Sequence, residues 1–116
     1  MRVDRGTVVL VDLDPTLGHE QKGLRPCIVV SDPAVNSDQR FPLVAVVPVT
    51  GTTGEGALYP VLTPGRSGLA RTSYALTDQV RSVDKRRIRR VFGAVTTGEL
   101  TAIDLGLALF LGLGES

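Results

Sequence analysis

Short apolar runs, separated by glycine, proline and charged residues, alternate along most of this chain. Valine-rich runs bounded by turn-forming residues are typical of β-strands. We expect strands at Thr7–Leu13, Arg25–Ser31, Leu43–Val49, Leu58–Leu62, Ser73–Leu76, Gln79–Val83 and Ile88–Val95. The run at residues 43–49 is nearly all apolar, which predicts burial on both faces. Pro48 near its end predicts an edge or a bulge.

The pattern changes period near residue 96. Thr96 and Glu99 have the spacing of a capping box, which predicts the start of a helix. Apolar residues then recur at helical spacing at Leu100, Ile103, Leu107, Phe110 and Leu111. Short strands followed by one C-terminal helix predict a mainly β fold, a small, partly open β-barrel with the helix packed over it. We find no repeat or linker and expect residues 1–116 to form one domain.

The polar connections add two expectations. Residues 14–24 are predicted to form a loop, and residues 31–42 a turn or a short helix. The Leu/Gly-rich segment Leu105–Gly114 is interpreted as helix core combined with packing against a second copy of the chain, because an apolar helix on so small a domain needs covering.

Composition excludes several classes of protein. The chain has 116 residues, a net charge of +1, one cysteine and one histidine. Cys27 and His19 alone cannot build a disulfide or an ordinary zinc site, so we expect no metal and no cofactor. Cys27 follows Pro26 in an apolar strand and is predicted to be a buried packing thiol. We see no signal peptide and no span long enough for a bilayer, which predicts a cytoplasmic protein without a membrane partner.

Positive charge is concentrated in one stretch. Six of the thirteen basic residues fall within ten positions: Arg81, Lys85, Arg86, Arg87, Arg89 and Arg90. Such a cluster is typical of a phosphate-binding surface. It is also typical of a solvated strand edge that resists aggregation. Both interpretations are compatible with the sequence.

Three motifs carry a resemblance to a known family. They are VDLDPTLGHEQKGLRPCIVVS at Val11–Ser31, VVPVT at Val46–Thr50 and TDQVRSV at Thr77–Val83. In this order and spacing they resemble the MazF/PemK (Kid-like) toxins of type II toxin–antitoxin systems, over essentially the whole chain. The resemblance implies an SH3-like barrel of the MazF/CcdB type and a homodimer. It also implies sequence-specific, metal-independent cleavage of single-stranded mRNA and neutralisation by a cognate antitoxin.

Cleavage of RNA without a metal uses the 2′-hydroxyl of the substrate as nucleophile. The enzyme must remove its proton, stabilise a pentacovalent phosphorane and protonate the leaving 5′ oxygen. The motifs imply three catalytic residues: Arg25 as the charge stabiliser, Thr50 as a phosphate contact and Glu20 as the general base. By residue type alone, Arg25 would as readily pair with Glu20 or Asp12 on the surface.

The remaining motif residues are candidates for RNA binding: His19, Gln21, Asp78, Gln79, Arg81, Arg86 and Arg87. Family members with R-x-D-Q offer the Arg and Asp as acid and base, but here Leu76 stands in place of that Arg. Asp78 is therefore expected to assist rather than act alone. Gln79 is expected to read a base edge and Arg81 to contact phosphate.

Two other functions remain open. The chain resembles in fold the CcdB gyrase poisons, which act by protein binding without catalysis. It is also compatible with a catalytically weak family member, because Leu76 removes one arginine. The E-Q…R-P loop and the P-V-T motif favour the nuclease.

Overall fold

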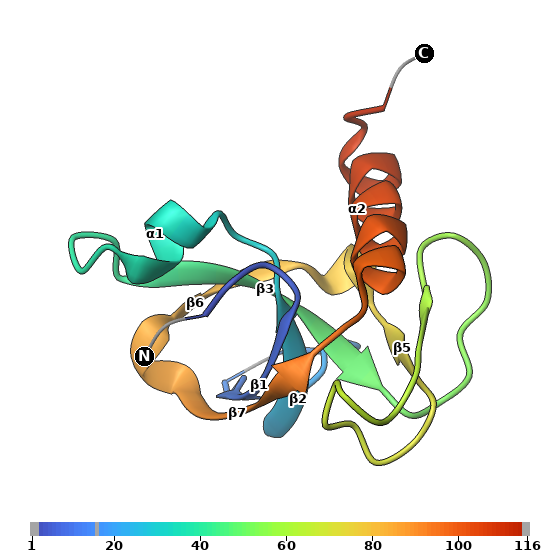
Figure 1. The fold of residues 1–116 in the computed structure, drawn as a ribbon, viewed down its shortest axis with the longest axis horizontal. Helices are drawn as coiled ribbons and strands as arrows, with labels where there is room; N and C mark the ends of the chain where they lie inside the picture. Colours follow the sequence, from blue (N-terminus) through green and yellow to red (C-terminus); the bar gives the residue numbers. More distant parts are fainter. Residues whose placement is uncertain (1–2, 16, 115–116) are drawn as a thin grey trace.

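A computed structural model describes residues 3–15 and 17–114 of the chain. The described elements, in order, are β1 (Thr7–Asp12), β2 (Leu24–Val29), α1 (Pro33–Ser37), β3 (Leu43–Thr50), β4 (Val61–Leu62), β5 (Ser73–Ala75), η1 (Thr77–Gln79), β6 (Arg81–Asp84), η2 (Lys85–Arg87), β7 (Ile88–Ala94) and α2 (Thr97–Leu111). The predicted mainly β fold with a C-terminal helix is confirmed (Figure 1). The predicted short helix is α1, whose first turn is capped by the Asp32 side chain.

The strands form one strongly bent antiparallel sheet in the order β4-β5-β3-β2-β1-β7, and β6 also pairs with β3. Along one edge, β3 pairs with β6 over residues 43–46 and then with β5 over residues 49–50. Pro48 lies where the partner changes, and its carbonyl accepts from the amide of Leu76 on that side. Pro48, which has no N–H to donate, therefore lies where β3 changes its partner from β6 to β5. This break in the strand pairing agrees with the edge or bulge that Pro48 predicted.

Two predicted strands are wrong in part. The run at residues 58–62 forms a strand only at Val61–Leu62, and Gln79 belongs to the 3-10 turn η1 instead of a strand. Local turns interrupt both runs, since the Tyr59 amide donates to the Gly56 carbonyl at 3.0 Å and the Gln79 amide donates to the Leu76 carbonyl at 2.9 Å. The Thr77 amide and hydroxyl both donate to the Leu58 carbonyl, at 3.2 and 2.6 Å, in the same register as the pairing of β4 with β5.

Apolar side chains pack on both faces of the central strand, as predicted for it. Val46 belongs to a cluster with Val9, Val11 and Cys27, whereas Val47 belongs to a second cluster on the other face. Helix α2 covers this second cluster through Ile103, which is fully buried. The barrel thus has one interior core and one core beneath its helix.

Helix α2 begins with the capping box that the sequence predicted. Glu99 N donates to Thr96 Oγ1 at 3.1 Å, and Thr96 N donates to Glu99 Oε1 at 2.9 Å. Arg5 ties the middle of the helix to the sheet, because its guanidinium binds Asp104 and the Val30 carbonyl. None of the helices within residues 3–15 and 17–114 is long and apolar enough to cross a membrane.

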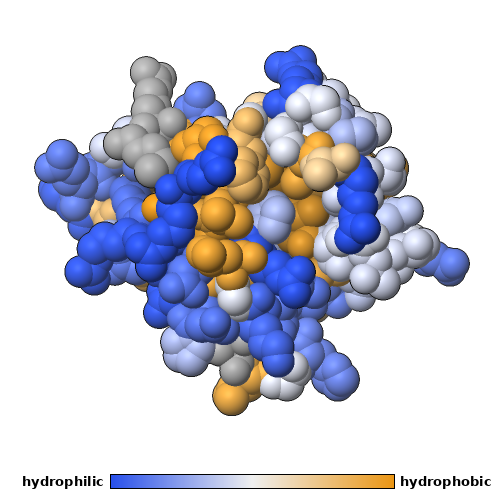
Figure 2. Space-filling model, turned by 90° about the horizontal axis from the view of Figure 1, so that it is seen from below, coloured by the Kyte–Doolittle hydropathy of each residue, from blue (hydrophilic) through white to orange (hydrophobic). Residues whose placement is uncertain are grey.

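The far end of α2 projects beyond the sheet (Figure 1). Its large apolar side chains are solvent-exposed there: Leu105, Leu109, Phe110 and Leu111, followed by Leu113. Further apolar side chains reach the surface in patches among hydrophilic ones on the face seen from below (Figure 2). Phe110 and Leu111, which the helical spacing includes, therefore lie outside the core of the single chain.

Candidate functional site

Two adjoining hollows lie between β3, η1 and the loops beside them. The first, of about 350 Å³, is lined by Gln21, Thr50, Thr52, Thr53, Gly54, Tyr59, Leu76 and Gln79. The second, of about 250 Å³, is lined by Glu20, Gln21, Pro48, Asp78, Gln79, Val80 and Arg81. Gln21 and Gln79 belong to both walls, so we refer to the pair as the double hollow. It brings together six residues predicted from the motifs: Glu20, Gln21, Thr50, Asp78, Gln79 and Arg81.

Arg25 lies beside the double hollow on β2. The pairing of β2 with β3 sets Cys27, two residues along β2 from Arg25, opposite Pro48, which lines the second hollow. The Arg25 side chain is exposed, and its Nε donates to the Lys22 carbonyl at 3.1 Å. Within the part of the chain that the structure describes, its guanidinium makes no ion pair. The surface pairing with Glu20 or Asp12 that residue type alone suggests is absent there.

Thr50 and Glu20, the other two predicted catalytic residues, each accept a hydrogen bond from a nearby backbone amide. Thr50 Oγ1 accepts from Thr52 N at 3.1 Å, which leaves the hydroxyl proton of Thr50 available to a ligand. Glu20 Oε1 accepts from Leu17 N at 3.3 Å, within its own loop. The Glu20 side chain is exposed and retains capacity to accept further hydrogen bonds.

Gln79 of η1 and two arginines that follow it in the sequence hold the loop that follows β1. Gln79 Oε1 accepts from Gln21 N at 2.8 Å, and Gln79 Nε2 donates to the His19 carbonyl at 3.5 Å. Arg81 Nη1 donates to the Leu13 carbonyl at 3.3 Å. Arg87 Nη1 donates to the carbonyls of Asp12 and Asp14 in the same loop. Several polar groups predicted to bind RNA thus also bind protein backbone.

The basic cluster is partly neutralised by carboxylates. Arg86 pairs with Asp84 at 3.0 Å, and this hydrogen-bonded contact lowers the pKa of Asp84 to about 2. Arg89 pairs with Asp12 at 3.4 Å. Arg86 and Arg87 line another hollow together with Asp12, Asp14, Asp84 and Arg89, and that hollow shares no lining residue with the double hollow. The structure therefore separates these two arginines from the six grouped residues.

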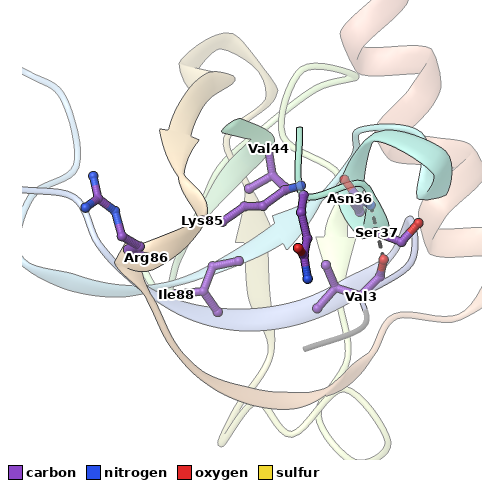
Figure 3. Close-up of a pocket in the computed structure, with 8 residues that line it drawn as sticks. Val3, Asn36, Ser37, Val44, Lys85, Arg86 and Ile88 are labelled. Atoms are coloured by element: carbon purple, nitrogen blue, oxygen red, sulfur yellow. Dashed lines mark hydrogen bonds between the residues drawn. The ribbon is translucent and has the colours of Figure 1, made fainter. Parts of the chain in front are cut away.

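A further hollow, of about 310 Å³, opens beside Lys85 (Figure 3). Its floor is apolar, with Val3, Val44 and Ile88. Lys85 Nζ donates to two carbonyls of the α1 segment, and the Asn36 amide donates to the Val3 carbonyl. These polar groups already have partners in the protein, so Lys85 fastens α1 to η2 and stays away from the double hollow.

Sequence reasoning missed Tyr59. Its hydroxyl donates to Asp78 Oδ2 at 2.7 Å, and this hydrogen bond to a carboxylate raises the pKa of Tyr59. The other oxygen, Asp78 Oδ1, is enclosed and has no hydrogen-bond partner among the described residues. The only signal for Tyr59 in the sequence was that aromatic residues are rare. Tyr59 is one of two tyrosines in the chain.

Cys27 is fully buried, and burial raises the pKa of its thiol to about 12 despite the opposing charge of Arg81. This confirms the predicted packing role. Across residues 3–15 and 17–114, no three His, Cys, Asp or Glu side chains come together in a group suited to a metal ion.

The mainly β fold with one C-terminal helix is shared with solved structures of endoribonuclease toxins. One such structure, an endoribonuclease in complex with its cognate antitoxin from a mycobacterial species, superposes with a TM-score of 0.81 at 26% identity, covering 98% of this chain and 99% of that one. The family described as the PemK-like, MazF-like toxins of type II toxin–antitoxin systems matches residues 4–111. The chain belongs to this family.

Two characterised relatives support the same assignment. The chain is 35% identical over 115 residues to endoribonuclease MazF9 of Mycobacterium tuberculosis, which covers 94% of this chain and 96% of that protein. It is 38% identical over 84 residues to endoribonuclease PemK of Escherichia coli, which covers 72% of this chain but only 62% of PemK, less than two thirds of its length. The predicted family, fold and endoribonuclease class are confirmed.

Proposed function

We propose that this chain is a single-domain, cytoplasmic toxin that cleaves single-stranded mRNA at specific sequences, without a metal, and is neutralised by a cognate antitoxin. The observation that carries this proposal is the position of Arg25. It is exposed, has no ion pair among the described residues, and lies on β2 two residues from Cys27, whose partner Pro48 lines the double hollow. An arginine left without a carboxylate partner is suited to bind the phosphate of a substrate.

In the proposed reaction, the 2′-oxygen of the RNA attacks the adjacent phosphorus while its proton passes to the Glu20 carboxylate. The bond from phosphorus to the 5′ oxygen breaks, and that oxygen takes a proton from water and leaves as a hydroxyl. The products are a 2′,3′-cyclic phosphate and a 5′-hydroxyl end. Arg25 donates to the oxygens of the phosphorane, and the free hydroxyl proton of Thr50 supports a second contact to phosphate.

RNA beyond the cleaved bond is proposed to contact the rim of the double hollow. His19 and Gln21 lie on the loop beside Glu20, and Arg81 lines the hollow itself. Arg86 is exposed and Arg87 lies close by, so these two are proposed to bind phosphates farther along the strand. Because Asp84 and Asp12 offset part of this charge, their contribution is expected to be weaker than the sequence alone indicates.

Two protein partners are proposed. A related endoribonuclease is known in complex with its cognate antitoxin, which supports an antitoxin for this chain as well. An acidic segment that folds on binding would compete with RNA for Arg25 and Arg81. The exposed apolar face of α2 supports a homodimer, since contiguous apolar surface of this kind usually meets a partner.

Incubating the purified protein with mixed-sequence RNA, with and without EDTA, tests the function. We expect cleavage under both conditions, at a restricted set of sequences found by mapping the new 5′ ends. Intact RNA under both conditions would refute the nuclease proposal, and loss of cleavage in EDTA would refute its metal-free chemistry.

The Leu109→Glu variant tests the dimer by sedimentation. We expect the parent to be dimeric and the variant to be monomeric, and an unchanged dimer would contradict the α2 interface.

A further inference from the structure

The 3-10 turn η1 lies between the two loops that form the double hollow. The first loop, between β1 and β2, supplies Glu20 and Gln21 to the hollow. The second loop, residues 51–60, supplies Thr52, Thr53, Gly54 and Tyr59. The turn is thus placed to act on both.

Each of the three residues of η1 forms a hydrogen bond with one of these loops. Thr77 donates twice to the Leu58 carbonyl of the second loop. Asp78 accepts the Tyr59 hydroxyl of the same loop at 2.7 Å. Gln79 accepts the Gln21 amide of the first loop at 2.8 Å. Consecutive residues of one short turn therefore fasten two loops that are far apart in the sequence.

The surroundings of Asp78 favour this holding role over direct chemistry. One carboxylate oxygen is occupied by Tyr59, and the other is enclosed, so neither is presented to solvent as a free proton acceptor. An enclosed carboxylate oxygen without a partner costs free energy, and such a cost persists where the group serves a purpose. The phenol of Tyr59 keeps its proton to higher pH than an ordinary tyrosine, so the hydrogen bond is maintained across the neutral range.

We propose that Tyr59, Asp78 and Gln79 are positioning residues that form a clasp, holding both loops in the arrangement that selects which RNA sequences are cut. This inference rests on the proposed ribonuclease function. It assigns Tyr59 a role in specificity and gives Gln79 a task other than reading a base edge. The clasp acts through the loops, whereas Arg25, Thr50 and Glu20 act on the phosphate.

Hydrogen exchange without RNA tests the clasp independently of activity. We expect Tyr59→Phe to speed amide exchange in residues 52–60, and Gln79→Ala to speed it at Gln21, each by about tenfold, the effect of losing one hydrogen bond. Tyr74→Phe and Gln39→Ala are the matched controls and should exchange like the parent. Unchanged exchange in the first two variants, with thermal melts showing that all are folded, would overturn the clasp.

Cleavage assays then test what the clasp does. We expect Tyr59→Phe to reduce the preference for the best cut site over secondary sites by about tenfold, because the freed second loop selects less strictly. Unchanged preference would overturn the role in specificity. A parent protein that leaves RNA intact would instead refute the proposed function, and the exchange experiment would still decide whether η1 holds the loops.

Substitutions at Asp78 separate positioning from catalysis. The amide oxygen of Asp78→Asn still accepts the Tyr59 hydroxyl but cannot serve as a base, whereas Asp78→Ala loses the contact. We expect Asp78→Asn to retain most of the site preference that Asp78→Ala loses. In a spectroscopic titration, the pKa of Tyr59 should fall toward its ordinary value in both variants, because the carboxylate is gone. Complete loss of cleavage in folded Asp78→Asn would show direct catalysis and overturn the positioning role.

Discussion

Gly106 of α2 lies directly against Thr77 of η1. A Cβ atom at Gly106 would come within 2.9 Å of Thr77 Oγ1 and within 2.8 Å of the Ala57 carbonyl oxygen. Side-chain carbons do not approach other atoms so closely, so the helix can pack here only because residue 106 is glycine. The helix, the turn and the loop that carries Tyr59 therefore meet at one point.

We predict that Gly106→Ala destabilises the protein even though alanine favours helices. The added methyl group must displace Thr77 and a backbone carbonyl, which costs about 1–3 kcal/mol and exceeds the propensity gain of about 1 kcal/mol. Urea denaturation measures the change. Gly98→Ala is the matched control, because the only atom near its Cβ is Thr96 Oγ1 at 4.0 Å. That variant should be stabilised by roughly 0.5–1 kcal/mol, and equal stability of the two variants would contradict the close packing at Gly106.

Arg25→Ala is expected to lower the rate of RNA cleavage by about a hundredfold or more, because the charge on the phosphorane loses its stabiliser. The side chain is exposed, so the free energy of unfolding should change by no more than about 0.5 kcal/mol. Arg25→Lys should recover little activity, since an ammonium group cannot donate the bidentate fork. Arg40→Ala, at an exposed arginine paired with Asp38, controls for loss of one positive charge. An active Arg25→Ala variant would refute the assignment.

The thiol of Cys27 should not react with thiol reagents in the native protein at neutral pH. Its pKa of about 12 leaves almost no thiolate, and the sulfur is fully buried. We expect labelling to become fast only in urea, where the chain is unfolded. Rapid labelling of the folded protein would show that β2 opens readily and would contradict the burial of this strand.

Much of the fold was predictable because its determinants are local. The capping box at Thr96 and Glu99 and the valine-rich run of β1 depend on neighbours a few residues away. The error at Gln79 arose in a short polar–apolar run, where the Gln79 amide closes a 3-10 turn onto the Leu76 carbonyl and the residue pattern does not distinguish such a turn from a strand.

The candidate site was predictable only through motifs. Glu20, Thr50 and Arg81 come from separate segments, and their order in the motifs was the reason to group them. Tyr59 stands in no motif, and its partner Asp78 lies in another segment, so only the folded structure joins them. The basic run after β6 shows the limit of counting charges in the sequence. Asp84 offsets part of the charge of Arg86, and the ammonium group of Lys85 donates to a backbone carbonyl of the protein.

Glu99 makes the stability of α2 depend on pH. Burial would raise its pKa, but hydrogen bonds from Thr96 and Thr63 together outweigh burial, and the pKa of Glu99 is lowered. A carboxylate whose pKa is lower in the folded state stabilises the fold above its unfolded pKa, and the contribution is lost as the pH falls through the folded value.

We expect Glu99→Gln to be less stable than the parent by about 1 kcal/mol at neutral pH. Urea denaturation over a series of pH values should show this difference shrinking in acid, because the parent then loses the charge that the variant lacks. Glu55→Gln, on the exposed second loop, should show no such convergence. A difference that stayed constant down to the lowest pH at which the parent is folded would contradict the role of the Glu99 charge.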